Sequence, residues 1–179
     1  MATVTETTPR AWVGCLGCYN DGRLNGSWVE GVNAGDISLA VKVKVGNPAI
    51  YGEGCLVCVT CGSDEFNVFD HEGYEGLIRG ECSPVEAQEK AELIESAGDE
   101  WPMFRAYLSN CGSGDLNEAR DAFIGEFDSW TEVADQLVDD CGLLSDAPAL
   151  LVRYFDYEAY GRDLSYDGFE VDGFYFWSR

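Results

Sequence analysis

The sequence predicts an α+β protein made of three small modules. Strand-like patterns dominate the first third of the chain, and capped helical patterns follow from residue 83 onward. An aromatic-rich end with a central Asp-Gly pair predicts a β-hairpin. The expected modules are residues 1–76 with a mixed sheet, residues 77–114 with helices, and residues 115–179 with helices and the terminal hairpin.

The first module is predicted to be a small sheet. An apolar stretch and a second one ending at Trp28 flank the turn-rich sequence YNDGRLNG, which favours a hairpin or a strand followed by a wide loop. Residues 36–45 fit either a β-branched strand or a short helix. Residues 54–62 predict a strand, and residues 65–77 predict a strand that runs into a glycine-rich turn.

A full set of helix-start signals opens the second module. Ser83 stands at the N-cap position, Pro84 begins the first turn, and Glu86 follows three residues after the cap. Gly98 then ends this helix. A second short helix is expected over residues 102–110.

Two capping pairs predict the helices of the third module. Asp115 with Glu118 opens a helix over the sequence LNEARDAFIG. Ser129 with Glu132 opens the next helix, which Gly142 closes as the first residue beyond its end.

The remainder of the third module is predicted to hold little more than short elements. Residues 147–164 supply one or two further helical turns. Asp172 and Gly173 stand between aromatic runs, which is a strong signal for a tight hairpin turn.

Net charge sets the class of partner. The chain has 33 acidic and 11 basic residues, a net of −22, while its 46% hydrophobic content is enough for a real core and excludes an acidic disordered tail. Residues 1–62 carry a net of −1 and residues 63–179 a net of −21. Such a surface repels nucleic acids and membranes and attracts a basic partner. Without an apolar run of about 18 residues or a signal-like start, we expect a soluble intracellular protein.

Like charges follow one another along the predicted helix that Ser129 caps, beginning with the residue before the cap. Asp128, Glu132, Asp135 and Asp139 are spaced by four, three and four residues, with no Lys or Arg between them. Neighbouring like charges of this kind destabilise a helix by about 0.2 to 0.5 kcal/mol per pair. The pattern therefore favours either a surface kept for binding or the solvated face of an acidic protein.

Eight cysteines raise the question of a metal. Cys15 with Cys18, and the series Cys55, Cys58 and Cys61, have the Cys-x-x-Cys spacing that is compatible with zinc. Both segments look β-rich, and residues three apart in a strand point to opposite faces, so a pair would need a bulge to chelate a metal. We therefore favour structural thiols over zinc, and zinc over disulfides, because nothing marks the chain as secreted.

Signals for catalysis are absent from the sequence. His71 is the only histidine and is interpreted as a loop or sheet residue instead of a base, which removes most schemes with a nucleophile and a histidine. The sequence contains no phosphate-binding loop, nucleophile elbow or zinc-protease motif. We expect no enzymatic activity.

Four segments, in this order, resemble the ArdA-type antirestriction proteins: PRAWVGCLGCYNDGRLNGSW, FDHEGYEGL, LNEARDAFIGEFDSWTEVADQLVDDCGLL and YFDYEAYGRDL. The resemblance covers nearly the whole chain and is most specific over residues 116–164. Residues 36–66 depart from it, because the family more often has a helix there and lacks this cysteine cluster.

The resemblance implies an elongated homodimer whose surface carboxylates imitate the phosphates of bent B-form DNA. Such a protein occupies the DNA-binding groove of a type I restriction-modification enzyme and binds neither nucleic acid nor membrane. It needs no cofactor or metal. It acts in the cytoplasm of a bacterial host and is carried by a phage, a plasmid or another mobile element.

Twelve carboxylates on the predicted helices and their caps are expected to carry the mimicry: Glu86, Glu89, Glu92, Glu95, Asp115, Glu118, Asp121, Asp128, Glu132, Asp135, Asp139 and Asp140. Leu143, Leu144 and Tyr154 fit either a dimer interface or the core, and the core is favoured because a small module needs its apolar residues. The alternative function is a zinc-stabilised acidic protein-interaction module built on Cys15, Cys18, Cys55, Cys58 and Cys61.

Overall fold

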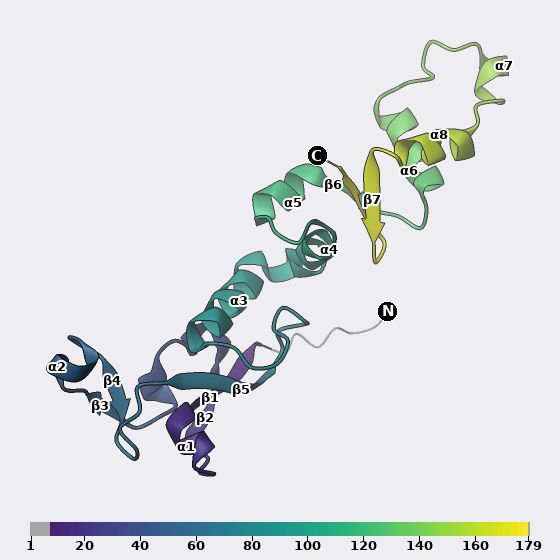
Figure 1. Ribbon diagram of the computed structural model, residues 1–179. Helices are drawn as coiled ribbons and strands as arrows, with labels where there is room; N and C mark the ends of the chain where they lie inside the picture. Colours follow the sequence, from purple (N-terminus) through teal and green to yellow (C-terminus); the bar gives the residue numbers. More distant parts are fainter. Residues whose placement is uncertain (1–7, 179) are drawn as a thin grey trace. The chain divides into compact units, whose positions relative to one another are not determined.

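The structure combines helices with antiparallel strands, which confirms the predicted α+β class (Figure 1). The computed structural model describes residues 8–178. The chain forms two compact units, Met1–Ser96 and Ala97–Arg179. The division into three modules stays a prediction. No helix among residues 8–178 has the length and apolar character needed to cross a membrane.

The first unit contains a three-stranded sheet, a two-stranded hairpin and one long helix. Its elements are β1 (Arg10–Cys15), α1 (Leu16–Asn20), β2 (Gly26–Glu30), η1 (Gly31–Asn33), η2 (Ile37–Leu39), β3 (Val43–Val45), α2 (Pro48–Tyr51), β4 (Leu56–Cys58), β5 (Phe66–Glu72) and α3 (Pro84–Ala97).

All strands of the first unit pair in the antiparallel sense. The main sheet has the order β2-β1-β5, and β3 pairs with β4 in a separate hairpin. The predicted N-terminal sheet is therefore confirmed, but it is not mixed. The connection from β1 to β2 contains α1, so the wide-loop alternative applies to this segment.

Two strand predictions in this unit need correction. The strand expected over residues 54–62 is confined to β4, and the chain turns after Cys58 because Gly62 adopts a φ of 78°. The ambiguous residues 36–45 hold both a short 3₁₀ helix, η2, and the strand β3, so neither single interpretation was complete.

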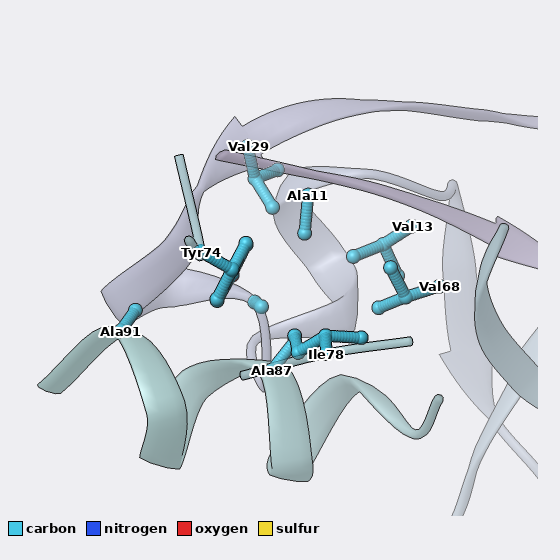
Figure 2. Packing of buried hydrophobic residues seen from close by; sticks show 9 residues of the cluster. Ala11, Val13, Val29, Val68, Tyr74, Ile78, Ala87 and Ala91 are labelled. Carbon is cyan, nitrogen blue, oxygen red and sulfur yellow. The ribbon is translucent and has the colours of Figure 1, made fainter. Parts of the chain in front are cut away.

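One core lies between α3 and the three-stranded sheet. Ala87 and Ala91 of α3 are fully buried and face Val13 and Val68 of β1 and β5 (Figure 2). The helix begins as predicted, because the Ser83 hydroxyl accepts a hydrogen bond from the Glu86 N–H at 3.1 Å. The small alanines let α3 approach the sheet closely, and its other side is left for charged residues.

The second unit is built around an aromatic core. Its elements are η3 (Gly98–Glu100), α4 (Trp101–Cys111), α5 (Leu116–Ala122), β6 (Phe123–Glu126), α6 (Trp130–Asp140), α7 (Ala149–Val152), α8 (Tyr157–Leu164), β7 (Gly168–Val171) and β8 (Phe174–Trp177).

Three short strands form the sheet of the second unit, in the order β6-β8-β7. The terminal hairpin is confirmed, with positive φ at both Asp172 and Gly173, as a tight turn of this type requires. The sequence LNEARDAFIG was expected to be helical throughout, but the helix α5 ends at Ala122. The chain then continues as β6, which pairs with β8, so tertiary pairing outweighs the local helical pattern.

The helix α6 ends as predicted and packs against α8. Gly142 has a φ of 59°, its N–H donates to the Asp139 carbonyl at 3.1 Å, and the Leu143 N–H donates to the Val138 carbonyl at 3.0 Å. These paired bonds form a Schellman motif. The residue at the turn of this motif must adopt a positive φ, which glycine does without strain. The end of α6 is thus fixed by its glycine.

Candidate functional site

The twelve predicted carboxylates all lie at the surface. Every one of them is exposed. Within residues 8–178, the eleven other than Asp121 form no ion pair. No basic side chain in this part of the chain therefore neutralises these eleven carboxylates.

On α3, the acids form a row opposite the buried alanines. Glu86, Glu89, Glu92 and Glu95 follow one another in steps of three residues. At about 3.6 residues per turn, such a row winds around the half of the helix that faces away from Ala87. The Glu92 carboxylate also accepts a hydrogen bond from the Gln88 amide at 2.7 Å, which fixes its position without removing its charge.

On α6, the acids share one face. Glu132, Asp135 and Asp139 lie opposite Val133 and Val138, which are buried. Glu132 also accepts a hydrogen bond from the Asp128 backbone N–H at 2.9 Å. The predicted four-residue helical row is shorter than expected, because α6 begins at Trp130 and Asp128 precedes it.

Glu126 and Asp172 were not among the predicted residues, yet they join this acidic group. Together with Asp128 and Glu132 they surround a surface hollow of about 360 Å³. The Arg105 guanidinium lies 3.6 Å from the Asp172 carboxylate and partly balances it. The hairpin signal at Asp172 and Gly173 was the one usable clue, because a hairpin turn lies beside the end of a neighbouring strand. The pattern does not identify that strand.

An ion pair in the second unit involves Glu100, a carboxylate that is not among the twelve predicted ones. The Arg120 guanidinium donates two hydrogen bonds to Glu100, at 2.6 and 2.7 Å, and so lowers the pKa of the Glu100 carboxyl. This pair ties α5 to η3. Glu100 is therefore interpreted as a structural carboxylate and not as part of the binding surface.

The helix α5 begins with the predicted capping box. The Asp115 carboxylate accepts from the Asn117 and Glu118 N–H groups at 2.8 and 2.9 Å, and Glu118 accepts from the Asp115 N–H at 3.1 Å. Capping alone is a sufficient reason for these two acids to be present.

Substitution of Asp115 separates its cap from its charge. Asp115→Ala should lower the free energy of unfolding by about 1 kcal/mol, whereas Asp115→Asn should leave it within about 0.5 kcal/mol, because Asn caps as well as Asp. Urea unfolding of the two variants measures the difference. An equal loss in both variants would show that the carboxylate charge, and not the cap, stabilises α5.

His71 has a structural environment, which confirms its interpretation as a sheet residue. It lies in β5, and its ring meets Tyr74 edge-on with 5.7 Å between centroids. Within residues 8–178, no hydrogen bond joins its imidazole to a serine or cysteine side chain.

The core interpretation of the apolar residues after α6 is wrong for two of the three. Leu143 and Tyr154 are 53% and 78% exposed, and only Leu144 is half-buried. Leu150 and Leu151, both in α7, are also exposed. This segment therefore presents an apolar surface.

The cysteine segments differ from the prediction. Cys15 ends β1 and Cys18 lies in α1, while Cys58 ends β4 and Cys61 follows in a turn, so neither pair lies within one strand. The Sγ atoms of these four residues all lie within 4.8 Å of one another. The objection based on strand geometry was therefore wrong.

Hydrogen bonding also sets the acidity of one of these thiols. Burial alone favours the neutral form of Cys58, but hydrogen bonds from the backbone N–H groups of Cys61 and Thr60 and from the Cys15 and Cys18 thiols together outweigh it and lower the pKa of Cys58 to about 6. Cys55 lies outside the group, and its thiol is directed to the Leu56 carbonyl and Asp64.

Comparison with known protein families assigns this chain to a family. The model of a family described as antirestriction protein (ArdA) matches residues 11–176. A search of curated proteins gives no match.

Proposed function

Because the chain belongs to the ArdA family of antirestriction proteins, we propose that it inhibits type I restriction-modification enzymes by imitating bent B-form DNA. The surface carboxylates take the place of phosphates in the DNA-binding groove of the enzyme. The single observation that carries this proposal is the set of exposed acids on α3 and α6, none of which forms an ion pair with a basic side chain among residues 8–178.

The charge density of these helices supports the imitation. Acids three residues apart on α3 are separated by about 4.5 Å along the helix axis. One DNA strand carries a negative charge every 3.4 Å or so, hence the row reaches about three quarters of that density. The net charge of −22 equals that of roughly 37 Å of duplex, and a dimer would double it.

The hollow in the second unit supports a more local contact. Glu126, Asp128 and Glu132 converge on a space of about 360 Å³, which admits one long basic side chain. A lysine or arginine from the phosphate-binding surface of the enzyme would find several carboxylate oxygens there. We therefore assign Glu126 to the binding surface in addition to the twelve predicted carboxylates.

The proposed action requires no chemistry by the chain itself. Inhibition results from occupancy, so the protein acts as a stoichiometric competitor without a cofactor, and His71→Ala should inhibit as well as the wild type. The site of action is the cytoplasm of a bacterial host that carries the mobile element or phage encoding the protein.

A cleavage assay tests the proposal. A purified type I restriction enzyme, ATP and unmethylated target DNA are mixed with increasing amounts of the protein, and the assay is repeated at higher DNA concentration. Competition for the groove predicts that more DNA relieves the inhibition. Inhibition that is independent of DNA concentration would contradict occupancy of the groove.

We further propose that the apolar surface around α7 joins two chains in a homodimer. Leu150, Leu151 and Tyr154 are at least 60% exposed, and apolar groups of this size are typical of interfaces between subunits. The predicted interface residues Leu143 and Leu144 lie in the segment leading to it.

Substitution of Leu151 tests the dimer. Leu151→Asp places a charge in the proposed interface and should shift the protein from dimer to monomer in sedimentation velocity. Leu24→Asp is the matched control, because Leu24 is 77% exposed in the first unit, and this variant should remain a dimer. A wild type that is monomeric at every concentration would contradict the proposal, as would a Leu151→Asp variant that stays dimeric.

A further inference from the structure

Four cysteines from two distant parts of the first unit meet in one place. Cys15 and Cys18 come from the end of β1 and the start of α1, and Cys58 and Cys61 come from the end of β4 and the turn after it. Their four Sγ atoms lie within 4.8 Å of one another. Cys15, Cys18 and Cys58 are buried, and Cys61 lies at the surface.

Each Cys-x-x-Cys pair sits where the chain changes direction. Within a strand, the side chains of residues three apart point to opposite faces. Here the strand ends at the first cysteine of each pair, so the chain can turn and bring the two thiols to the same side. After the second pair, Gly62 has a φ of 78°, which makes the tight turn possible. Gly17 lies between the two cysteines of the first pair, and a Cβ atom added there would lie 3.2 Å from the Cys61 Sγ. Both glycines therefore serve the approach of the two pairs.

The distances suit one tetrahedral ion. Zinc binds thiolate sulfur at about 2.3 Å, which places the sulfurs of a tetrahedral site about 3.8 Å apart. The Sγ atoms of Cys18 and Cys58 are 3.8 Å apart, and those of Cys15 and Cys61 are 3.4 Å apart. A cluster of several iron atoms would need its cysteine sulfurs further apart than a single ion does. A disulfide needs about 2.05 Å between sulfurs, so neither pair is bonded.

Hydrogen-bond donors favour the thiolate form of Cys58. The Asn25 side-chain amide donates to the Cys58 Sγ at 3.1 Å, and the Thr60 backbone N–H donates to the same sulfur at 3.4 Å. Donors placed around the ligand sulfurs of a metal site stabilise their negative charge and orient them.

We propose that Cys15, Cys18, Cys58 and Cys61 bind one structural zinc ion. Four sulfur ligands leave no open coordination position, so the ion has a structural and not a catalytic role. On binding, the thiols lose their protons to solvent, and the zinc–tetrathiolate group carries a charge of −2. This proposal does not depend on the antirestriction function.

The ion would link the short β3–β4 hairpin to the rest of the first unit. The hairpin of β3 and β4 has only three residues in each strand, and an isolated two-stranded hairpin is at best marginally stable. Zinc links this hairpin to β1 and α1 and thus to the three-stranded sheet. A small apolar cluster of Val41 with Cys15, Cys18 and Cys58 also lies at this junction.

Metal analysis of the full-length protein tests the proposal. The protein is produced without a polyhistidine tag, purified without chelator, passed through gel filtration and measured by mass spectrometry for metals. One zinc ion per chain is expected. The double variant Cys18→Ser/Cys58→Ser should retain little or no zinc, whereas Cys55→Ser, the matched control at the neighbouring cysteine, should retain it all.

A second measurement covers the case in which the double variant does not fold. Wild-type protein is stripped of metal under reducing conditions and titrated with Co²⁺, which should give the intense visible bands of tetrahedral cobalt–thiolate and saturate at one ion per chain. Stripping should also lower Tm by several degrees, and added zinc should restore it. Wild-type protein with no zinc and no cobalt bands, with iron in place of zinc, or with disulfides among these four cysteines would overturn the proposal.

Discussion

Neutralising three acids of α6 together with Asp128, which precedes the helix, should raise the half-inhibitory concentration by roughly 30-fold to 1000-fold. The variant combines Asp128→Asn, Glu132→Gln, Asp135→Asn and Asp139→Asn, all at exposed positions. A surface charge pair contributes about 0.5 to 1 kcal/mol, so four lost pairs amount to about 2 to 4 kcal/mol of binding free energy. The half-inhibitory concentration in the cleavage assay measures the loss. Each single substitution should change it only a few-fold.

The matched control removes the same charge elsewhere. It combines Glu53→Gln, Asp64→Asn, Glu65→Gln and Asp70→Asn, four exposed acids of the first unit that lie outside the proposed surface. If net charge alone mattered, both variants would lose the same activity. The control should stay within a few-fold of wild type, and equal losses in the two variants would show that the acids act without regard to position.

Stability should move in the opposite direction from binding. Glu132, Asp135 and Asp139 form two like-charge pairs on α6, and each destabilises the helix by about 0.2 to 0.5 kcal/mol. The variant with the four substitutions at Asp128, Glu132, Asp135 and Asp139 should thus unfold at an equal or slightly higher urea concentration than wild type. Weaker inhibition in a protein that is no less stable separates a lost contact from a lost fold.

Gly161→Ala should lower the free energy of unfolding by about 1 to 3 kcal/mol, although helix propensity alone predicts a gain of about 1 kcal/mol. Gly161 is buried in α8, where the helix crosses the start of α6. An added Cβ would stand 2.5 Å from the Trp130 carbonyl oxygen, and a backbone atom cannot turn away. Helix α8 must therefore shift relative to α6.

Chemical unfolding of Gly161→Ala gives the sign directly. Arg162→Ala, at the exposed neighbouring position of α8, serves as the control and should stay within about 0.5 kcal/mol of wild type. Inhibition should weaken as well, since α6 carries Glu132 and follows Asp128. A stabilised Gly161→Ala variant would mean that α6 and α8 do not pack as closely as described.

Features fixed by local chemistry were predictable from the sequence. The N-cap of Ser83, the capping box at Asp115, the glycine end of α6 and the turn at Asp172 each depend on a few adjacent residues, and all are present. The exposed acids followed from the same patterns, because an apolar stripe defines the buried side of a helix and leaves the opposite side to solvent.

Features that depend on distant pairing were not predictable in the same way. Residues 123–126 continue a helical pattern, and only β8 converts them to a strand. The hollow needs the turn at Asp172 to lie beside Glu126, which the strand order β6-β8-β7 brings about.

The cysteine group shows how much depends on a strand boundary. Had β1 continued past Cys15, its thiol and that of Cys18 would point to opposite faces, as the sequence pattern suggested. The strand instead ends at Cys15, and β4 ends at Cys58. Boundaries are set by tertiary packing, so spacing alone left zinc and structural thiols unresolved.

Displacement of DNA at two salt concentrations tests the central claim most directly. A purified type I restriction enzyme holds labelled unmethylated DNA and is titrated with the protein at about 50 mM and about 200 mM salt. The inhibition constant at each salt is corrected for the enzyme's own affinity for DNA. Imitation of phosphates by carboxylates predicts full displacement at low salt and a weaker inhibition constant at high salt. No displacement at low salt, with several type I enzymes, would contradict the account.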